Sequence, residues 1–406
     1  MTRQASVHPL RNEIRPYAWG SVTALPEFLG VDPTGQPAAE LWMGAHPGAP
    51  SRLADNEGTL ADLIAADPKE LLGADVAERF GNSLPFLLKV LAVERPLSLQ
   101  AHPNLAQAAA GFEDEELRGI PLDAAERNYK DPNHKPEQVC ALTPFTGMCG
   151  FRPVTQTAEL LTALNVSRLQ GYPERLAGVG GLREVVTGFL TMPEAVITDL
   201  IDQVVPALER LAGAPGRWHD QGEWMLELAH EYPHDRGVMV CLLLNLVHLE
   251  PGESMFLGAG VPHVYLRGTA VEILASSDNV LRCGFTPKHV DVPELMRVLR
   301  IEETPLPATE PTEVAPGIAQ YPSEVPDFVL YRLRPRAGPI ALPAGAPRIL
   351  LCTRGTIELS DTLDEDGAPT DIGRGGSAFL PADAQIRVSA VTGEPEAYLA
   401  TVNAVL

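Results

Sequence analysis

Residues 84–99, LPFLLKVLAVERPLSL, form two apolar runs separated by Glu94-Arg95-Pro96. Short apolar runs bounded by turn residues are typical of buried β-strands. The residues that follow the second run read QAHPN, which brings Gln100 and His102 directly after it. In an extended chain, positions i and i+2 face the same side. The stretch therefore predicts two strands that end in a pair of polar side chains directed toward a common partner.

The sequence beyond this stretch alternates between strand-like and helix-like patterns. Residues 155–245 have helical spacing, most clearly in PEAVITDLIDQVVPALERL (193–211), where apolar residues recur every three to four positions. This predicts an α-helical insertion, in which Pro206 is expected to kink or break a helix. Residues 249–275 and the end of the chain return to short runs between glycines and prolines, which is typical of β-barrels and sandwiches. The predicted fold is mainly β with a helical insertion.

A short internal repeat supports two related β units. ESMFLGAGVPH (253–263) aligns without gaps with GSAFLPADAQI (376–386), and each copy follows a glycine. The first copy ends in His263, whereas the second has Ile386 at that position. If both copies are barrels, only the first keeps the polar side chain.

Composition restricts the partners of the protein. The 406 residues suggest two or three domains, and a formal charge of −22 argues against nucleic acid or an anionic membrane as a partner. The five cysteines are odd in number and form no CxxC pair, which favours a reducing compartment. No charged segment near residue 1 leads into an apolar run, and no stretch approaches twenty uncharged apolar residues, so we expect neither a secretory leader nor a membrane span. We expect a soluble, cytoplasmic protein.

Four residues are candidates for a shared metal ion. Gln100 and His102 are joined by His263 and by Glu137 of NHKPE (133–137). Two imidazoles, a carboxylate and an amide oxygen suit a borderline divalent ion, zinc first, with a position left open for water or substrate. Each of these residues could equally be a polar group that hydrogen bonds elsewhere, so spacing alone leaves the metal site open.

A second metal motif is rejected. HEYPH (230–234) matches the H-E-x-x-H pattern of zinc proteases, which requires both histidines on one helix face. Pro233 lies inside the motif, removes a helical N–H and biases Tyr232 away from helical angles. We expect His230 and His234 to be polar residues where a helix of the insertion ends.

A family resemblance favours the metal interpretation. Stretches between residue 12 and about residue 295 closely resemble the type I mannose-6-phosphate isomerases and occur in that family's order, whereas the tail is less distinctive: NEIRPYAWG (12–20), AELWMGAHP (39–47), LPFLLKVL (84–91), PLSLQAHP (96–103), NHKPE (133–137), PHVYLRG (262–268) and SSDNVLRCGFTPKHVDVPEL (276–295). The family is a zinc-dependent aldose–ketose isomerase. By this resemblance, one zinc ion per chain is held by Gln100, His102, Glu137 and His263.

The resemblance also implies an architecture of two cupin-like, jelly-roll β-barrels and a helical domain. Residues 1–154 and 246–319 would form the catalytic barrel, residues 155–245 the helical insertion and residues 320–406 a metal-free barrel. The implied substrate is a sugar phosphate, and the implied state is a monomer. Such an enzyme supplies mannose 6-phosphate for GDP-mannose and glycan precursors, or feeds mannose into glycolysis.

The implied reaction opens the sugar ring and moves a proton between C2 and C1 through a cis-enediol. A general base must lie within hydrogen-bond reach of both carbons. Lys135, Glu272 and His134 are candidates, and the sequence does not choose among them. His134 is also a candidate for binding the substrate.

Arg282 occupies the position of the arginine regarded as catalytic in the family. Its guanidinium can bind an oxyanion or a phosphate with two parallel hydrogen bonds. Lys288 lies six residues later and could add a charge for the phosphate. Because the whole protein is acidic, Arg282, Lys288 and Lys135 would have to create a local positive pocket.

Other residues in the family-like motifs have less defined roles. The large aromatics among them more often fill a core or a domain junction than touch a ligand: Tyr17, Trp19 and Trp42. His46 could approach the pocket. Asn12 and Lys89 also match the family, but no chemical role for them follows from the sequence.

Two rival functions remain open. Cupin-like barrels also serve as oxygenases, in which two histidines and a carboxylate hold Fe(II). The cations Lys135, Arg282 and Lys288 argue instead for a phosphorylated substrate. The second rival is a non-catalytic sugar-binding barrel with a structural metal, against which the intact ligand and arginine motifs argue.

Overall fold

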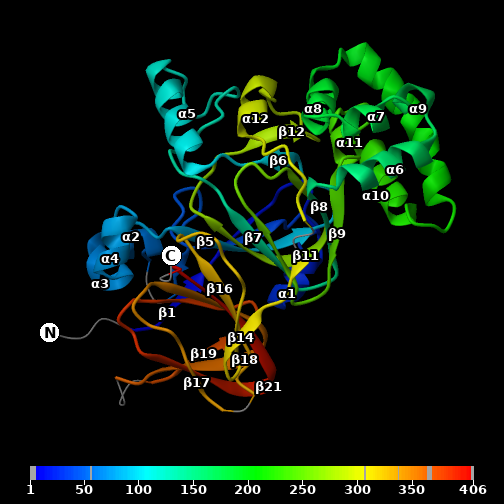
Figure 1. Cartoon of the computed structure of the whole chain (residues 1–406). Helices are drawn as coiled ribbons and strands as arrows, with labels where there is room; N and C mark the ends of the chain where they lie inside the picture. Colours follow the sequence, from blue (N-terminus) through cyan, green and yellow to red (C-terminus); the bar gives the residue numbers. More distant parts are fainter. Residues whose placement is uncertain (1–5, 55–56, 306–307, 337, 364–367, 404–406) are drawn as a thin grey trace.

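The computed structural model describes residues 6–54, 57–305, 308–336, 338–363 and 368–403. About 31% of the described residues lie in strands and 29% in helices. The chain is therefore mixed, and the prediction of a mainly β protein understated its helical content, because several helices also lie outside the insertion. Figure 1 shows the two antiparallel sheets, with the strands of the C-terminal part, coloured yellow to red, below the others.

The first sheet is organised around its longest strand, β11 (His263–Ala275). The two strands predicted from the opening stretch are β5 (Phe86–Val93) and β6 (Leu99–Ala101), and both pair with β11. β11 also pairs with two further strands and shifts register between Tyr265 and Arg267. The remaining strands of this sheet are β2 (Glu13–Arg15), β3 (Glu40–Met43), β7 (Glu137–Ala141), β8 (Phe145–Phe151), β9 (Leu244–Leu249), β10 (Ser254–Leu257), β12 (Leu281–Gly284) and β13 (Ala308–Thr309).

The second sheet is built mostly from the end of the chain. Its strands are β14 (Thr312–Ala315), β15 (Ile318–Gln320), β16 (Val329–Leu333), β17 (Ile340–Ala341), β18 (Arg348–Asp361), β19 (Thr370–Gly373), β20 (Ser377–Leu380) and β21 (Ile386–Thr401). Two N-terminal strands, β1 (His8–Arg11) and β4 (Arg52–Leu53), join this sheet through the pairing of β1 with β20. The start of the chain thus ties the two halves together, and the domain limits expected from the sequence stay a prediction.

Most of the helical residues lie in the segment that the sequence predicted to be helical, which Figure 1 shows in green at the upper right. The segment with helical spacing contains α6 (Val154–Leu164), a 3₁₀ turn (Ser167–Leu169), α7 (Tyr172–Ala177), α8 (Gly181–Thr191), α9 (Glu194–Ala212), α10 (His219–Glu231) and α11 (Gly237–Cys241). The other helices are α1 (Ala24–Leu29), α2 (Leu60–Ala66), α3 (Pro68–Leu72), α4 (Ala74–Arg79), α5 (Leu105–Leu117) and α12 (Val292–Val298). Within the described ranges, no helix combines the length and the apolar character that crossing a bilayer requires.

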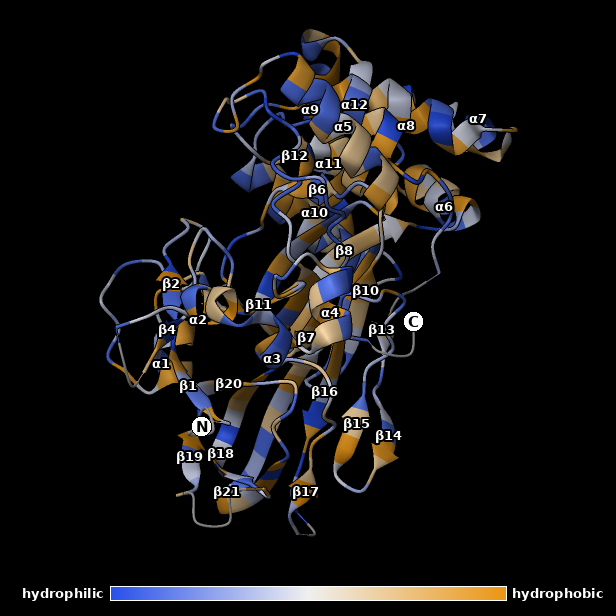
Figure 2. Ribbon diagram, turned by 90° about the vertical axis from the view of Figure 1, so that its left-hand side faces the viewer, coloured by the Kyte–Doolittle hydropathy of each residue, from blue (hydrophilic) through white to orange (hydrophobic). Residues whose placement is uncertain are grey.

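Pro206 does not break its helix, contrary to one of the two outcomes expected from the sequence, because α9 runs through it without interruption. A proline inside a helix loses one backbone hydrogen bond and costs about 3 kcal/mol. α9 also buries an apolar stripe against the rest of the insertion, including Leu200 and Val204. This packing outweighs the local cost. The colours of Figure 2 show the alternation of apolar and polar residues on the helices of this region.

The rejected HEYPH motif has the predicted geometry. α10 ends at Glu231, and Tyr232 is its C-cap residue. His234 lies beyond the helix with a φ of 62°, and its Nε2 is 3.1 Å from Oδ1 of Asp202. His230 and His234 therefore do not share a helix face.

The structure confirms the alignment of the internal repeat. The four-residue strands β10 and β20 occupy equivalent positions, and the next strands begin at the equivalent residues His263 and Ile386. The turns also match, because the N–H of Gly252 donates to Ala141 and the N–H of Gly375 donates to Cys352 at 2.8 Å each.

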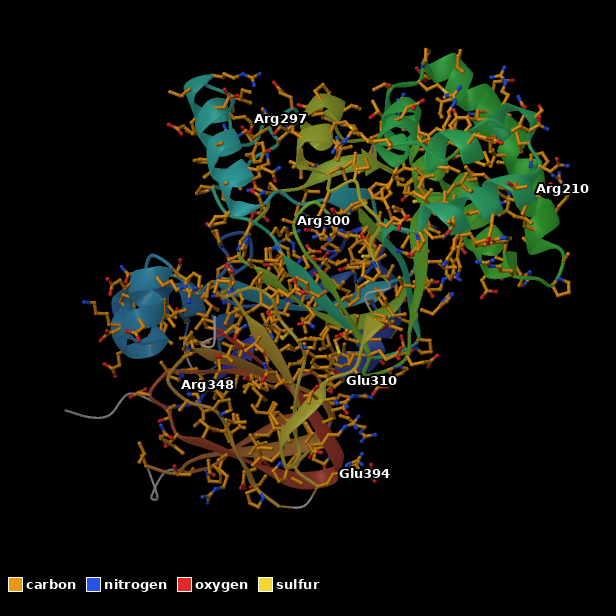
Figure 3. All side chains as sticks on the ribbon, viewed as in Figure 1. Arg210, Arg297, Arg300, Glu310, Arg348 and Glu394 are labelled. Atoms are coloured by element: carbon orange, nitrogen blue, oxygen red, sulfur yellow. The ribbon has the colours of Figure 1, made fainter. Side chains whose placement is uncertain are left out.

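The strand register extends the repeat to a further pair of residues. Leu257 and Leu380 are equivalent, and they lie opposite Glu137 and Arg348 respectively. The guanidinium of Arg348, which is fully buried, donates to the carbonyls of the loops around it: Pro343, Pro381 and Ala384. Figure 3 labels Arg348 on the left side of the lower sheet. The second sheet thus has a fixed cation where the first has Glu137.

A charge at Phe379 tests the packing between the sheets. Phe379 is fully buried in a cluster that joins both sheets, with members such as Leu88, Val271, Ile349 and Leu351. Phe379→Asp is expected to lower the free energy of unfolding by about 3–5 kcal/mol, because it removes an aromatic ring and buries an unpaired charge. Denaturant titration measures this loss.

The matched control is Val391→Asp, because Val391 is 46% exposed on β21, which lies in the same sheet as β20 with β18 between them. A surface change of this kind should alter the free energy of unfolding by no more than about 0.5 kcal/mol. Equal unfolding midpoints for the two variants would contradict the proposed packing role of Phe379.

Candidate metal centre and cavity

Three buried side chains from the ends of three strands meet in the first sheet. His102 follows β6, while Glu137 and His263 are the first residues of β7 and β11. Nε2 of His102 lies 3.3 Å from Oε1 of Glu137, and Nε2 of His263 lies 3.4 Å from Oε2 of the same carboxylate. The three potential ligand atoms lie within 4.8 Å of one another, and each residue is at most 2% exposed. This geometry brings together three of the four predicted ligands.

Backbone carbonyls orient both imidazoles. Nδ1 of His102 donates to the carbonyl of Asn279 at 2.7 Å, and Nδ1 of His263 donates to that of Val261 at 3.1 Å. With the proton on Nδ1, each Nε2 presents a lone pair toward Glu137. This is the tautomer that a metal-binding histidine needs.

Polar atoms in the middle of this group lack hydrogen bonds. Within the described part of the chain, Nε2 of His102 and Oε2 of Glu137 are buried without a hydrogen-bond partner. Burial, and then the charge of Lys135, lower the pKa of His102 to about 4, so its imidazole is neutral near pH 7. Burial opposes ionisation of Glu137, but Lys135 and His102 hold its pKa well below the usual value. A neutral imidazole and an ionised carboxylate with unused lone pairs fit a divalent cation such as zinc.

Gln100 is the fourth predicted ligand, and it lies at the edge of this group. It is opposite His263 in the pairing of β6 with β11, and its Nε2 is 3.4 Å from Nε2 of His263. The oxygen and nitrogen of an amide are assigned from their hydrogen bonds, and a half-turn exchanges them. After such a half-turn, the Gln100 oxygen would face the histidine nitrogens.

A cavity of about 590 Å³ opens beside the group. Gln100 and Glu137 form part of its wall. Its other lining residues include most of the residues that the sequence predicted to act on a substrate, together with several that it did not: Lys135, Glu272, Arg282, Lys288, Tyr17, Trp19, Trp42, Glu40, Lys89, Tyr232, Tyr265, Asp278 and Phe285. The cavity therefore combines potential metal ligands with buried charges and aromatic surfaces.

Buried ion pairs line the inner wall of the cavity. Nζ of Lys135 is 2.8 Å from Oε1 of Glu137, as expected for two residues on one side of an extended segment. Nζ of Lys89 lies 3.3 Å from Glu40 and 3.5 Å from Glu272. Burial, followed by the charge of Glu137, raises the pKa of Glu272 to about 7. A carboxyl group with this pKa can accept and return a proton near neutral pH.

Arg282 and Lys288 lie toward the outer part of the cavity. Arg282 is opposite Gln100 in the pairing of β12 with β6, so the same ladder that holds Gln100 also places the guanidinium. Burial lowers the pKa of Arg282, and burial followed by the charge of Arg282 lowers that of Lys288. Neither side chain has an ion-pair partner among the residues that the structure describes. They are the cations left to meet an anionic ligand.

His134 does not take part in this cavity as the sequence predicted. Its Nε2 lies 2.9 Å from Oδ2 of Asp327, and it lines a separate cavity of about 720 Å³. The roles predicted for His134, as a substrate contact or as the base, stay predictions, and the structure places this residue outside the cavity that Arg282 and Lys288 line. Local spacing in NHKPE could not show this, because Asp327 comes from a distant part of the chain.

The remaining residues of the family-like motifs lie in the cavity wall, behind it, or near the second sheet. Nε2 of His46 is 3.4 Å from Oδ2 of Asp278, so the ring lies behind a residue of the cavity wall. Asn12 donates to Ser377 at 2.7 Å, at the point where the chain passes from β1 of the second sheet to β2 of the first. Tyr17 and Trp19 stack on each other at 5.9 Å between ring centroids and line the cavity.

Lys89 and Tyr265 are two cavity residues whose roles the sequence did not predict. Lys89 is a charged residue inside an apolar strand, and this contrast could have marked it as functional. Tyr265 lies two residues after His263, and strand alternation brings both to the same side. Its hydroxyl is buried without a hydrogen-bond partner among the described residues.

Comparisons with known proteins agree on one family. Residues 7–154 match the family model described as phosphomannose isomerase type I, catalytic domain. The chain is 41% identical over 395 residues to mannose-6-phosphate isomerase from Escherichia coli (strain K12), with 92% of this chain and 94% of that protein covered. It is 34% identical over 415 residues to the enzyme of the same name from Homo sapiens, with 94% of each chain covered.

Solved structures give the same result. The chain is similar to mannose 6-phosphate isomerase from Salmonella typhimurium bound to its substrate, fructose 6-phosphate, and to zinc, with a TM-score of 0.88 and 37% identity. A structure of mannose 6-phosphate isomerase bound with zinc and yttrium has the same TM-score and identity. Each match covers 98% of this chain and 100% of the solved chain.

Metal analysis of histidine variants tests the centre. His102→Ala and His263→Ala are expected to lose most of the bound zinc, because each removes one of few ligands. His230→Ala and His234→Ala are the controls, since these histidines flank the end of α10, and they should keep the zinc of the unmodified protein. A full zinc equivalent in the purified His263 variant, or loss of zinc in the His230 variant, would refute the ligand assignment.

Proposed function

Because this chain belongs to the type I phosphomannose isomerase family, we propose that its cavity isomerises mannose 6-phosphate and fructose 6-phosphate reversibly. The observation that carries the proposal is the position of two unpaired cations, Arg282 and Lys288, in the same cavity as the buried group of His102, Glu137 and His263. A metal centre and a site for a phosphate within one cavity match an isomerase of sugar phosphates.

The enzyme uses zinc, as do its solved relatives. We assign its ligands to His102, Glu137, His263 and the amide oxygen of Gln100, with one zinc ion per chain. A zinc ion at this place supplies Lewis acidity that lowers the cost of negative charge on the sugar oxygens. Position and charge of the surrounding side chains must provide the rest of the catalysis.

Glu272 is the best-placed proton-transfer group among the three candidates from the sequence. Its pKa of about 7 suits a base that removes a proton from carbon and returns it to the neighbouring carbon. The ammonium of Lys89, 3.5 Å away, stabilises its ionised form. Lys135 is bound to Glu137 and is better suited to provide fixed positive charge near the developing enediolate.

Arg282 and Lys288 would hold the phosphate and the negative charge of the reacting sugar. A guanidinium stays charged and presents a planar pair of donors, whereas an ammonium provides a compact charge. The formal charge of the protein is −22, so its overall field repels a sugar phosphate. Salt screens charges beyond about 8–10 Å, which lets a local pair of cations dominate inside the cavity.

The finer architecture also remains our proposal. The two sheets correspond to two cupin-like barrels, with residues 1–154 and 246–319 in the catalytic unit, 155–245 in the helical insertion and 320–406 in a metal-free unit. Arg348 and Ile386 at the positions equivalent to Glu137 and His263 support the absence of a second metal site. The strands β1, β4 and β14 and the start of β15 are exceptions to these limits, since they pair within the second sheet.

We further propose that the enzyme works as a cytoplasmic monomer. In this setting it would supply mannose 6-phosphate for GDP-mannose and glycan precursors, or pass mannose into glycolysis. The proposal rests on the family and on the acidic composition of the chain.

Turnover under anaerobic conditions tests the proposed reaction. The zinc-loaded protein is expected to convert mannose 6-phosphate into fructose 6-phosphate without oxygen, and glucose 6-phosphate should be converted far more slowly. An oxygen requirement would favour the Fe(II) oxygenase, and binding of the sugar phosphate without turnover would favour the non-catalytic barrel. Either result would refute the isomerase.

Arg282→Ala separates a role in chemistry from a role in binding. If the guanidinium stabilises charge in the transition state, the variant should keep its zinc and lose about 10²–10³ in kcat, with a smaller change in KM. If it only binds the phosphate, KM should rise while kcat holds. Steady-state kinetics in both directions measure the two constants.

Arg282→Lys serves as the matched comparison, because it keeps the positive charge and loses the planar pair of N–H donors of the guanidinium. Strong impairment of this variant would indicate a bidentate contact. A near-normal kcat for Arg282→Ala at saturating mannose 6-phosphate would remove Arg282 from the chemistry.

A further inference from the structure

The turn between α10 and α11 packs against the loop that follows β12. This loop, residues 284–288, leads from Arg282 to Lys288 and forms part of the cavity wall. Figures 1 and 2 both show α11 beside β12, which is where the helical insertion meets the catalytic sheet. A residue in this turn can therefore influence the shape of the cavity without touching its contents.

Asp235 links the two segments through its carboxylate. Oδ2 accepts a hydrogen bond from the N–H of Phe285 at 2.9 Å, and Oδ1 accepts one from the N–H of Gly237 at 2.7 Å. A carboxylate that accepts backbone N–H groups forms stronger hydrogen bonds than a neutral acceptor does. The two oxygens thus bind the first residue of α11 and the start of the cavity loop together.

The backbone of the loop needs such support at Phe285. This residue has a φ of 58°, in the left-handed region that bulky side chains rarely adopt. Its side chain is 2% exposed and packs against the ring of Tyr232, with 5.0 Å between centroids. Disfavoured backbone angles persist only where the surroundings hold them, and here Asp235 and Tyr232 belong to the same turn.

Two glycines allow the turn and the loop to touch. A Cβ atom at Gly284 would lie 2.5 Å from Oδ1 of Asp235 and 2.8 Å from Cα of Gly237. A Cβ atom at Gly237 would lie 2.9 Å from the same oxygen and 3.0 Å from the ring of Phe285. Backbone packs directly on backbone at this contact, so a small change in the turn must move the loop.

The strand that leads into the loop is fixed separately. Leu281, Arg282 and Gly284 pair with Ala101, Gln100 and Leu99 of β6, with a register shift between Arg282 and Gly284. The β-ladder therefore positions Arg282, while the chain beyond Gly284 depends on the insertion. Lys288 lies on this dependent side.

From these contacts we propose that Asp235 is a positioning residue, which acts through Phe285 to hold the 284–288 loop so that Lys288 faces the phosphate of the substrate. The helical insertion is then part of the phosphate site, although Asp235 does not line the cavity. This inference rests on the proposed isomerase function, since it names the phosphate as the ligand. Its signature is a loss of phosphate affinity with little change in the chemical step.

Asp235→Asn tests the proposal with little change in size. An asparagine keeps one acceptor and turns its NH₂ group toward the other N–H, so one of the two contacts is lost. We expect KM for mannose 6-phosphate to rise at least about tenfold and kcat to change less than about threefold. The change in kcat should be small because the pairing of β12 with β6, which positions Arg282, is unaffected by the substitution. The zinc content should not change, and the inhibition constant of inorganic phosphate should rise in parallel with KM.

A double variant shows whether Asp235 acts through the loop. If the effect passes through Lys288, Asp235→Asn should raise KM much less in a Lys288→Ala background than alone. Gly237→Ala is a second variant outside the cavity, which pushes the turn against Phe285 and should also raise KM. Leu200→Ala is the control, because Leu200 is buried in α9 of the same insertion, and it should lower the melting temperature and leave KM unchanged.

Calorimetric binding of inorganic phosphate to the zinc-loaded proteins separates this inference from the proposed function. Weaker phosphate binding by both variants supports the positioning role even if the unmodified protein shows no isomerase turnover. If Asp235→Asn and Gly237→Ala are folded and their phosphate affinity and KM stay within twofold of the unmodified protein, the positioning role of Asp235 is overturned. This outcome would leave the isomerase function unaffected. An equal effect of Asp235→Asn with and without Lys288 would overturn the positioning role as well.

Discussion

The burial of Glu137 is the constraint on which the site depends. A carboxylate that is 2% exposed loses its hydration, and only nearby positive or donating groups can compensate for that loss. Lys135 provides one ion pair, whereas His102 and His263 turn the lone pairs of their Nε2 atoms toward the carboxylate. The remaining lone pairs leave room for a cation. Strand pairing in the first sheet therefore has to be accurate, since β6, β7 and β11 must bring their ends to the same place for the charge to be tolerated.

The second sheet meets the same constraint in a different way. At the position equivalent to Glu137, the chain has Arg348, whose guanidinium binds the loop carbonyls that surround it. At the position equivalent to His263 it has Ile386, which packs in an apolar cluster. A built-in cation with backbone acceptors needs no exogenous ion, whereas a carboxylate between two imidazoles does. One repeated framework thus has the candidate metal centre in one copy and a structural core in the other.

Local patterns predicted the parts of the site that depend on local geometry. Alternation along a strand placed Gln100 beside His102, and the gap-free repeat predicted that only the first copy keeps a polar side chain at the position of His263, where the second has Ile386. The ion pairs of Lys89 could not be predicted from local patterns. Its partners Glu40 and Glu272 come from β3 and β11, and only the assembled sheet brings them together. The expectation of a broken helix at Pro206 failed for a related reason: the propensity against a helix was local, and the packing that overrode it was not.

The inner and outer parts of the cavity differ in whether their cations are paired with carboxylates. Lys89 and Lys135 are neutralised by buried carboxylates, so they can stabilise a developing charge but do not offer a full charge to an incoming anion. Arg282 and Lys288 lie toward the exposed side, where an anion can approach. A sugar phosphate would therefore enter with its phosphate toward the 284–288 loop and its carbonyl end toward Glu137 and Glu272. Since the insertion contacts that loop and the β-ladder holds the inner wall, the binding end and the reacting end of the substrate rest on different parts of the fold. Affinity can then change through the insertion while the geometry of proton transfer is preserved.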